Sequence, residues 1–239
     1  MKPVLNILHL YPKDMNIYGD EGNLLVLQRR AEWYGYSANV IRYNPGDVLP
    51  KDIDIVLGGG GQDSGQEIIH ADLLKIGPAL KKLADNDIPM LMVCGLYQLF
   101  GHYFQTSKKT RLEGIGILDV KTIGTNERLI GNIVTESEEF GEIIGYENHS
   151  GQTFLGPKAK PLAIVRVGAG NNSKDGNEGA RYKNVIGTYL HGSLLPKNPL
   201  IADFLLRTAA TKKFGDFSND VIDDTFAEQA RAAAAKRPR

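Results

Sequence analysis

Short apolar runs alternate with longer amphipathic segments through the first hundred residues, and this alternation leaves few possible folds. Strand-like runs and helix-like segments follow one another at residues 3–10, 19–34, 37–43, 53–57, 67–84 and 88–93. The last run, IPMLMV, is apolar almost throughout, which is typical of a strand buried on both faces. Strand, helix and strand in this order form βαβ units, so we predict a parallel sheet flanked by helices.

The second half of the chain has a different character. Strand-like runs there are separated by glycine, asparagine and proline, at residues 129–134, 162–167 and 185–189. We predict antiparallel additions from these short strands, and a polar loop over the glycine-rich stretch GAGNNSKDGNEG at 168–179. Two closing helices are predicted at 198–210 and 219–235, and the basic tail AAAAKRPR is expected to fray.

Composition narrows the class of protein. The 239 residues carry 28 Lys and Arg against 28 Asp and Glu, and this neutral balance argues against a dedicated nucleic-acid binder. A single cysteine excludes a disulfide framework and a site of several zinc thiolates, so we predict no metal site.

No apolar run approaches the ~18 residues of a membrane span, and no signal-peptide cleavage site follows the N-terminus, so we expect a cytoplasmic protein that is not membrane-embedded. Without repeats or linkers, residues 1–239 are predicted to form one domain, with a C-terminal helix and tail from about 212 to 239.

Cys94 is the most informative residue. It directly follows the buried run at 88–93 and precedes Gly95 and a helix-like run at 96–100. A nucleophile on a sharp strand-to-helix turn stands at the carboxyl edge of the sheet. The start of the new helix is expected to lower the thiol pKa and favour the reactive thiolate. A buried structural cysteine is the alternative, and position alone does not separate the two.

Four glycines at residues 58–61 leave the end of the run at 53–57, at the same predicted sheet edge as Cys94. Glycine lets backbone N–H groups approach a ligand closely, and two such donors stabilise a developing oxyanion. A phosphate-binding P-loop is excluded because the closing Gly-Lys-Ser/Thr is absent. A flexible turn is the alternative.

Cysteine chemistry needs a base close in space, and the chain has five histidines. His191, which follows a predicted strand in GTYLHG, is our first candidate, and His149 in YENHSG is the second. The other three are predicted to be structural: His70 lies on a helix surface, His102 follows a helix, and His9 lies near the end of the first strand.

Taken together, these segments resemble the class I, triad-type glutamine amidotransferases. MLMVCGLYQLFG resembles their cysteine elbow, and GTYLHG resembles the histidine end of their cobyric-acid-synthase-like branch. GGGGQDSGQEI, NIYGDEGN and YENHSGQT resemble one group in that branch, the glutamine amidotransferase subunits of lipid II isoglutaminyl synthases. The resemblance extends from about residue 6 to residue 199. It implies an α/β, class I glutamine amidotransferase-like fold with a central, mostly parallel sheet flanked by helices and antiparallel additions in the second half.

The resemblance implies a glutaminase. Cys94 would attack the side-chain amide of L-glutamine and form a thioester, with His191 as base and then as acid. Backbone amides of Gly60 and Gly95 would form the oxyanion hole. Arg128 matches the arginine that holds the substrate in the isoglutaminyl synthase subunits, and its planar fork suits a carboxylate. Without the resemblance, we would interpret Arg128 as a surface charge in a loop.

A partner subunit is also implied. The chain has no P-loop or other nucleotide motif, so no cofactor is expected in it, and ATP and magnesium would bind on another chain. The resemblance implies a heterodimer with a Mur-ligase-like subunit. That subunit would use the ammonia to amidate the α-carboxyl of D-glutamate in the lipid II stem peptide, during peptidoglycan biosynthesis. A different acceptor, such as a cobyrinate-like carboxylate, and an inactive partner-binding scaffold are the alternatives.

Two positions depart from the class I pattern. Leu96 stands where class I enzymes usually carry a glycine, and it is expected to crowd the elbow or reshape the glutamine pocket. Ser193 stands where many carry a glutamate, so the acid that orients His191 is missing from its usual place. That acid would come from elsewhere in this chain or, as we favour, from across the interface with the partner.

Overall fold

The computed structural model describes residues 2–191 and 193–237. The elements of the first half follow the predicted order: β1 (Val4–Leu10), α1 (Glu21–Trp33), β2 (Ser37–Tyr43), β3 (Ile55–Gly58), α2 (Asp63–Asp85), β4 (Met90–Val93) and α3 (Gly95–Phe100). The predicted βαβ rhythm is therefore confirmed. The helix α2 begins before the predicted residue 67 because Asp63 and its neighbours extend the first turn, and it continues through Pro78.

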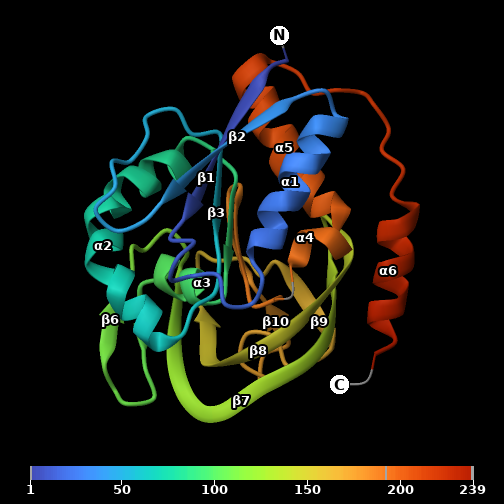
Figure 1. Ribbon diagram of the computed structural model, residues 1–239. Helices are drawn as coiled ribbons and strands as arrows, with labels where there is room; N and C mark the ends of the chain where they lie inside the picture. Colours follow the sequence, from blue (N-terminus) through green and yellow to red (C-terminus); the bar gives the residue numbers. More distant parts are fainter. Residues whose placement is uncertain (1, 192, 238–239) are drawn as a thin grey trace.

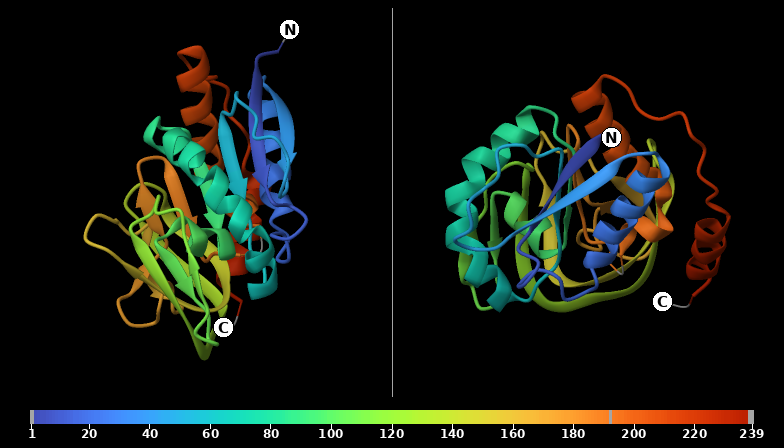
Figure 2. Two further views of the ribbon diagram at one scale, coloured as in Figure 1. Left: turned by 90° about the vertical axis from the view of Figure 1, so that its left-hand side faces the viewer. Right: turned by 45° about the horizontal axis from the view of Figure 1, so that its top comes forward.

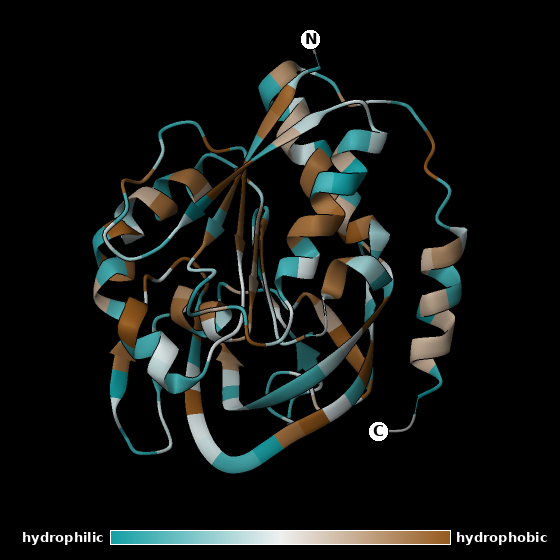
Figure 3. Cartoon of the chain, viewed as in Figure 1, coloured by the Kyte–Doolittle hydropathy of each residue, from teal (hydrophilic) through white to brown (hydrophobic). Residues whose placement is uncertain are grey.

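A six-stranded sheet forms the centre of the molecule, with the strand order β11-β12-β4-β3-β1-β2. Here β11 is Ala180–Tyr182 and β12 is Val185–Thr188. All neighbouring pairs are parallel except β11 and β12, as predicted for a mostly parallel sheet. Figure 1 shows α2 and α3 on one side of this sheet, and α1 with α5 (Pro199–Phe214) on the other. Because helices cover both faces, β3 and β4 are buried at every residue, and Figure 3 shows the central strands as hydrophobic.

A second sheet follows in the chain, and two of its strands are longer than the sequence predicted. β7 (Val120–Ser137) and β8 (Gly141–Leu155) pair antiparallel over almost their whole length. The shorter strands β5 (Tyr103–Gln105), β6 (Arg111–Glu113), β9 (Ala163–Val167) and β10 (Asn177–Glu178) complete it. In Figure 2 this sheet lies beside the central sheet rather than continuing it. The short strands predicted at 162–167 and 185–189 are confirmed as β9 and β12, although β12 joins the central sheet and pairs parallel with β4. The short strand predicted at 129–134 was wrong in length because polar residues and glycines alternate with apolar ones along β7 (Figure 3), and the prediction of a loop at 168–179 missed β10.

Three helices follow the sheets: α4 (Leu194–Lys197), α5 and α6 (Thr225–Ala235). Figure 1 shows α6 on the outside of the molecule, joined to α5 by an extended segment, and no residue of α6 is buried. Asp224 fixes its first turn by accepting hydrogen bonds of 2.5 and 3.0 Å from the buried guanidinium of Arg30 on α1. This helix begins later than the predicted residue 219, and the last two residues of the predicted frayed tail, 238–239, lie outside the described residues. No helix in the described part of the chain is both long and apolar enough to cross a membrane.

Four parallel strands, β1, β3, β4 and β12, end at the same edge of the central sheet. The segments that leave these ends are residues 11–20, residues 59–61, Cys94 and residues 189–191. Ligand sites of open α/β sheets lie at this carboxyl edge. The fold therefore brings four segments that are far apart in the sequence to one place.

Candidate active site

Cys94 occupies the predicted strand-to-helix turn. Its φ angle is +49°, in the left-handed region that residues other than glycine rarely adopt. The Cys94 N–H donates to the carbonyl of Thr188 on β12 (2.9 Å), and its carbonyl accepts from the Gln98 N–H on α3 (3.0 Å). These two hydrogen bonds hold the turn between a strand and a helix.

The Cys94 thiol is buried, and burial raises its pKa well above the usual range. The negative charge of Asp20 raises it further, and the hydrogen bond from the Gly95 N–H only partly offsets these effects. The Gly95 N–H at the helix start does lower the thiol pKa, but the predicted net lowering and reactive thiolate are wrong for this conformation because burial and Asp20 outweigh it. The six residues of α3 are all buried, so the loss of hydration outweighs the field of so short a helix. The thiol is neutral here and must lose its proton as it attacks.

Gly60 marks the point where the candidate residues meet. A Cβ atom added to Gly60 would lie 3.1 Å from Cys94 Cβ, 3.1 Å from Tyr18 Cδ2 and 3.2 Å from His191 Cε1. The structure thus brings together Cys94, His191 and the glycine run, as their shared sheet edge predicted. Any residue larger than glycine at position 60 would push these groups apart.

The His191 imidazole is 1% exposed and neutral. Its backbone N–H donates to the carbonyl of Tyr146 on β8 (2.8 Å), and its ring centroid lies 4.2 Å from that of Tyr18. Within residues 2–191 and 193–237, neither ring nitrogen has a hydrogen-bond partner. Burial lowers the His191 pKa to about 3, and the nearby Arg128 guanidinium acts in the same direction. The ring is therefore unprotonated at neutral pH, as a base must be before it takes a proton.

Ser193 does not orient His191. Its hydroxyl donates instead to the carbonyl of Gly19 (2.6 Å), in the segment between β1 and α1. A Cβ atom added to Gly22 would lie 2.2 Å from Ser193 Oγ, so the serine also packs closely on the start of α1. The residue at the usual glutamate position of the class I pattern therefore holds a neighbouring segment, and the imidazole has no acid there.

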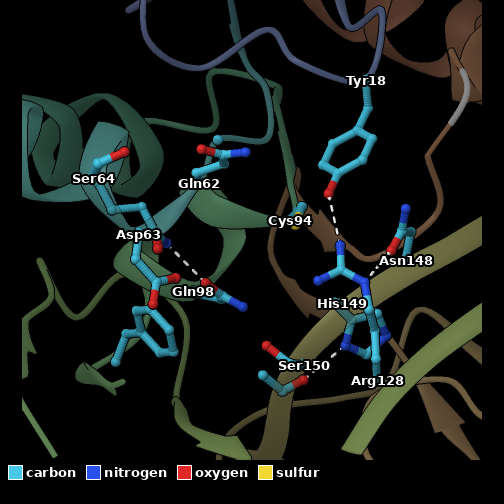
Figure 4. Close-up of a pocket in the computed structure, with 14 residues that line it drawn as sticks. Tyr18, Gln62, Asp63, Ser64, Cys94, Gln98, Arg128, Asn148, His149 and Ser150 are labelled. Carbon is cyan, nitrogen blue, oxygen red and sulfur yellow. Dashed lines mark hydrogen bonds between the residues drawn. The ribbon is translucent and has the colours of Figure 1, made fainter. Parts of the chain in front are cut away.

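A cavity of about 400 Å³ opens beside Cys94, and Arg128 enters it from β7 (Figure 4). Arg128 lies next to the register shift between β7 and β8, not in a loop. Its Nε donates to Asn148 Oδ1 (2.7 Å), and its Nη2 donates to the Tyr18 hydroxyl (3.2 Å). Two neutral groups thus orient the guanidinium, which forms no ion pair within residues 2–191 and 193–237, and such a cation suits the binding of a carboxylate.

His149 lines the same cavity in a different setting. Its ring stacks on Tyr189 with centroids 3.5 Å apart, and its Nδ1 lies 2.7 Å from the Gly151 carbonyl. Burial lowers its pKa to about 4. The structure places the remaining histidines, His9 and two others at positions 70 and 102, outside the lining of this cavity.

The predicted oxyanion donors lie at the meeting point, and both already have partners. The Gly95 N–H hydrogen-bonds the Cys94 thiol. The Gly60 N–H donates to Asp20 Oδ2 (2.9 Å). Asp20 is buried, and burial raises its pKa to about 6. A Cβ atom added to Gly95 would lie 3.2 Å from the Gly61 nitrogen, so the two backbone loops face each other closely.

Leu96 does not crowd the cavity, contrary to expectation. A Cβ atom added to Gly58 would lie 2.3 Å from Leu96 Cδ1, so the leucine fills the space that this glycine leaves at the end of β3. Leu96 is fully buried and is not among the residues that line the cavity. Glycine at position 58 therefore accommodates the departure from the class I pattern.

Sequence reasoning missed several residues of the site, chiefly Tyr18, Asp20 and Asn148. Tyr18 and Asp20 belong to NIYGDEGN, and Asn148 to YENHSGQT, so both motifs were visible without a role for these side chains. Gln66, whose Nε2 donates to the Gly95 carbonyl (3.1 Å), was also missed. Contacts between distant segments define all four, and no local pattern encodes such contacts.

Comparison with known proteins agrees with this geometry. Residues 6–199 match the CobB/CobQ-like glutamine amidotransferase domain. The chain is 40% identical over 234 residues to a Staphylococcus aureus protein named lipid II isoglutaminyl synthase (glutamine-hydrolyzing) subunit GatD, covering 98% of this chain and 96% of that protein. A Streptococcus pneumoniae protein of the same name is 40% identical over 229 residues, covering 94% and 88%. The crystal structure of a glutamine amidotransferase from Thermotoga maritima superposes with a TM-score of 0.57 at 16% identity, covering 96% of this chain and 93% of that one, which confirms the predicted fold.

Proposed function

The chain belongs to the CobB/CobQ-like glutamine amidotransferase family, and from this premise we propose that it is the glutamine-hydrolysing subunit of a lipid II isoglutaminyl synthase. The observation that carries the proposal is the meeting of Cys94, His191 and Gly60 at one point, beside a cavity that holds Arg128. Two relatives that match nearly the whole chain bear that name.

The geometry supports a thioester route. Cys94 Sγ attacks the side-chain amide carbon of glutamine while neutral His191 takes the thiol proton. The tetrahedral intermediate collapses as His191 returns that proton to the nitrogen, which leaves as ammonia. Water then attacks the thioester and releases glutamate and the free thiol. Because burial raises the thiol pKa and lowers the His191 pKa, transfer of the thiol proton to His191 accompanies the attack.

Arg128 supports recognition of free glutamine. Its oriented guanidinium would bind the substrate α-carboxylate in the cavity, with Asn148 and Tyr18 as its positioning partners. A cavity of about 400 Å³ accommodates an amino acid of this size.

Ammonia released here needs an acceptor that is activated elsewhere. We assign ATP and magnesium to a Mur-ligase-like partner, which would amidate the α-carboxyl of D-glutamate in the lipid II stem peptide at the cytoplasmic face of the membrane. The word "subunit" in the relatives' names supports a heteromeric assembly. Co-purification from a strain that expresses a tagged copy of the chain tests this assignment, and the partner should carry the fold of a Mur ligase.

Substitution of the nucleophile tests the glutaminase itself. Cys94→Ser should abolish glutamine hydrolysis and keep the thermal unfolding transition, because one buried sulfur is exchanged for one oxygen. A glutamine-mimicking electrophile should add one label to the parent chain and none to the variant, as read by intact mass. Labelling of both chains would remove Cys94 from the role of nucleophile. No labelling of the parent, with or without its partner, would favour an inactive scaffold.

A further inference from the structure

Asp20 occupies the backbone N–H of Gly60, which the proposed function assigns to the oxyanion. Its Oδ2 accepts the Gly60 N–H (2.9 Å), and its Oδ1 is buried with no hydrogen-bond partner among the described residues. Asp20 as a residue is only 4% exposed, so bulk water does not hydrate its carboxylate. A carboxylate with one orphaned oxygen costs folding free energy, which points to a role outside fold stability.

The segment that carries Asp20 lies tightly over the glycine loop. A Cβ atom added to Gly59 would lie 2.3 Å from the Met15 carbonyl oxygen and 2.7 Å from Asp20 Cβ. The Ile17 N–H donates to the Gly60 carbonyl (3.2 Å), which ties the two segments together a second time. This approach is possible only because position 59 has no side chain.

The same segment touches both of the other functional side chains. Tyr18 lies against the His191 ring and accepts a hydrogen bond from Arg128. Figure 4 shows the Tyr18 hydroxyl directed at the Arg128 guanidinium, on the side of the cavity near Cys94. Residues 14–20 therefore contact the base, the carboxylate anchor and the oxyanion loop at once.

We infer that Asp20 is a latch that blocks the oxyanion hole in this conformation, so that glutamine is hydrolysed only after Asp20 releases the Gly60 N–H. The inference rests on the proposed function, which assigns this N–H to the oxyanion. One N–H cannot serve Asp20 and the oxyanion together, and two negative charges on neighbouring sites repel each other. Release of the latch would also remove the negative charge that disfavours the Cys94 thiolate.

Removing the carboxylate tests the latch. Asp20→Ala in the full chain should raise kcat for glutamine hydrolysis at least about tenfold, since one oxyanion-hole donor is typically worth ~10²–10³ in kcat. The variant also loses a charge near the thiol. Alkylation of Cys94 by iodoacetamide, which forms no oxyanion, measures that second effect alone. The latch predicts that the increase in hydrolysis exceeds the increase in alkylation.

Two further variants make the result decisive. Asp20→Asn keeps an oxygen that accepts from the Gly60 N–H and removes the charge, so its hydrolysis rate should lie between those of the parent and Asp20→Ala. Glu21→Gln removes the neighbouring carboxylate, which pairs with Arg42 (2.6 Å), and should leave hydrolysis unchanged. If thermal unfolding shows that Asp20→Ala is not folded, the Asn variant carries the test.

The outcomes separate this inference from the proposed function. Hydrolysis that rises no more than alkylation would overturn the latch, and so would slower hydrolysis by folded Asp20 variants. In both cases the parent would still hydrolyse glutamine, and the proposed function would stand. If the parent hydrolyses no glutamine even with its partner bound, the proposed function fails and the latch fails with it.

Discussion

His191 and His149 are both buried near Cys94, and their surroundings separate them. His191 Cε1 and Cys94 Cβ both approach the position of Gly60, and the His191 ring nitrogens have no partner among the described residues. The His149 ring stacks on Tyr189 and its Nδ1 meets the Gly151 carbonyl. A base must exchange protons freely, and a ring held by backbone and by stacking does so less well.

We therefore predict that His191→Ala lowers kcat by at least ~10²-fold, the lower end of the contribution of general acid–base catalysis. His149→Ala serves as the matched variant and should lose much less. A glutaminase assay at saturating glutamine ranks the two, and circular dichroism verifies that each variant is folded. The reverse ranking would exchange their roles.

Arg128 should act on substrate affinity rather than on the chemical step. A charge-assisted hydrogen bond contributes roughly 1.5–3 kcal/mol, so Arg128→Ala should raise KM for glutamine at least about tenfold. Tyr18→Phe removes only the neutral positioning contact of 3.2 Å and should raise KM less.

Ammonia provides the control for Arg128. In the full complex, added ammonium salt should restore amide synthesis by Arg128→Ala, because we assign the acceptor site to the partner. If the variant stays inactive with excess ammonia, Arg128 serves the fold or the subunit interface and not glutamine binding.

The short strand β10 fixes the end of β12, next to His191. Glu178 on β10 is fully buried, and its Oε1 accepts hydrogen bonds from the Thr188 hydroxyl (2.6 Å) and the Tyr189 N–H (2.9 Å). Burial raises the Glu178 pKa from its ordinary 4.5 to about 7. The protonated form is therefore the one that the folded state favours.

The stability of the fold should reflect this titration. Below about pH 4.5 Glu178 is protonated in both the folded and the unfolded chain, so its contribution to the free energy of unfolding is fully present. This contribution is lost as the pH rises through about 7. From pH 5 to pH 8 the parent should lose roughly 3 kcal/mol of unfolding free energy relative to Glu178→Gln. Urea unfolding of both chains at the two pH values measures this difference, and parallel pH profiles would contradict the prediction.

The sequence predicts the strands of the central sheet well and the strands of the second sheet poorly. β3 and β4 are buried on both faces, so their continuous apolar runs are plain in the sequence. Along β7 buried and exposed positions alternate, polar residues such as Thr122 and Thr135 are buried, and the run from Val120 to Ser137 contains two glycines, so it resembles several strands. The sequence consequently predicts a loop position for Arg128, although the residue lies in β7 and enters the cavity.

The residues of the candidate site likewise divide into those that the sequence predicts and those that it does not. Cys94 and His191 follow strands of one parallel sheet, so βαβ topology alone places both at its carboxyl edge. Asp20 and Tyr18 reach the site because one segment folds back over the glycine loop, which depends on contacts between distant residues. The thiol pKa also depends on such contacts, since burial and Asp20 override the field of α3.

At the scale of the whole molecule, the chain encloses His191 without offering it an acid. Within the described residues Ser193 bonds to Gly19, Asp20 to Gly60 and Glu178 to the end of β12, and none of them bonds to the imidazole. A second cavity of about 420 Å³ reaches His191 between β8 and α6, with two basic residues, Lys197 and Arg237, in its lining. A carboxylate that entered this cavity would be favoured by their charge.

We therefore predict that the partner subunit completes the site by presenting a carboxylate to His191. A carboxylate on the second ring nitrogen fixes the tautomer and stabilises the imidazolium, so kcat for glutamine hydrolysis should rise when the partner binds. The measurement compares kcat of the isolated chain and of the complex at saturating glutamine, with Cys94→Ser in the complex as the blank. The partner should also raise the His191 pKa, because a negative charge favours the protonated ring, and NMR titration of the imidazole follows that shift. Equal kcat values would show that this chain orients His191 by itself.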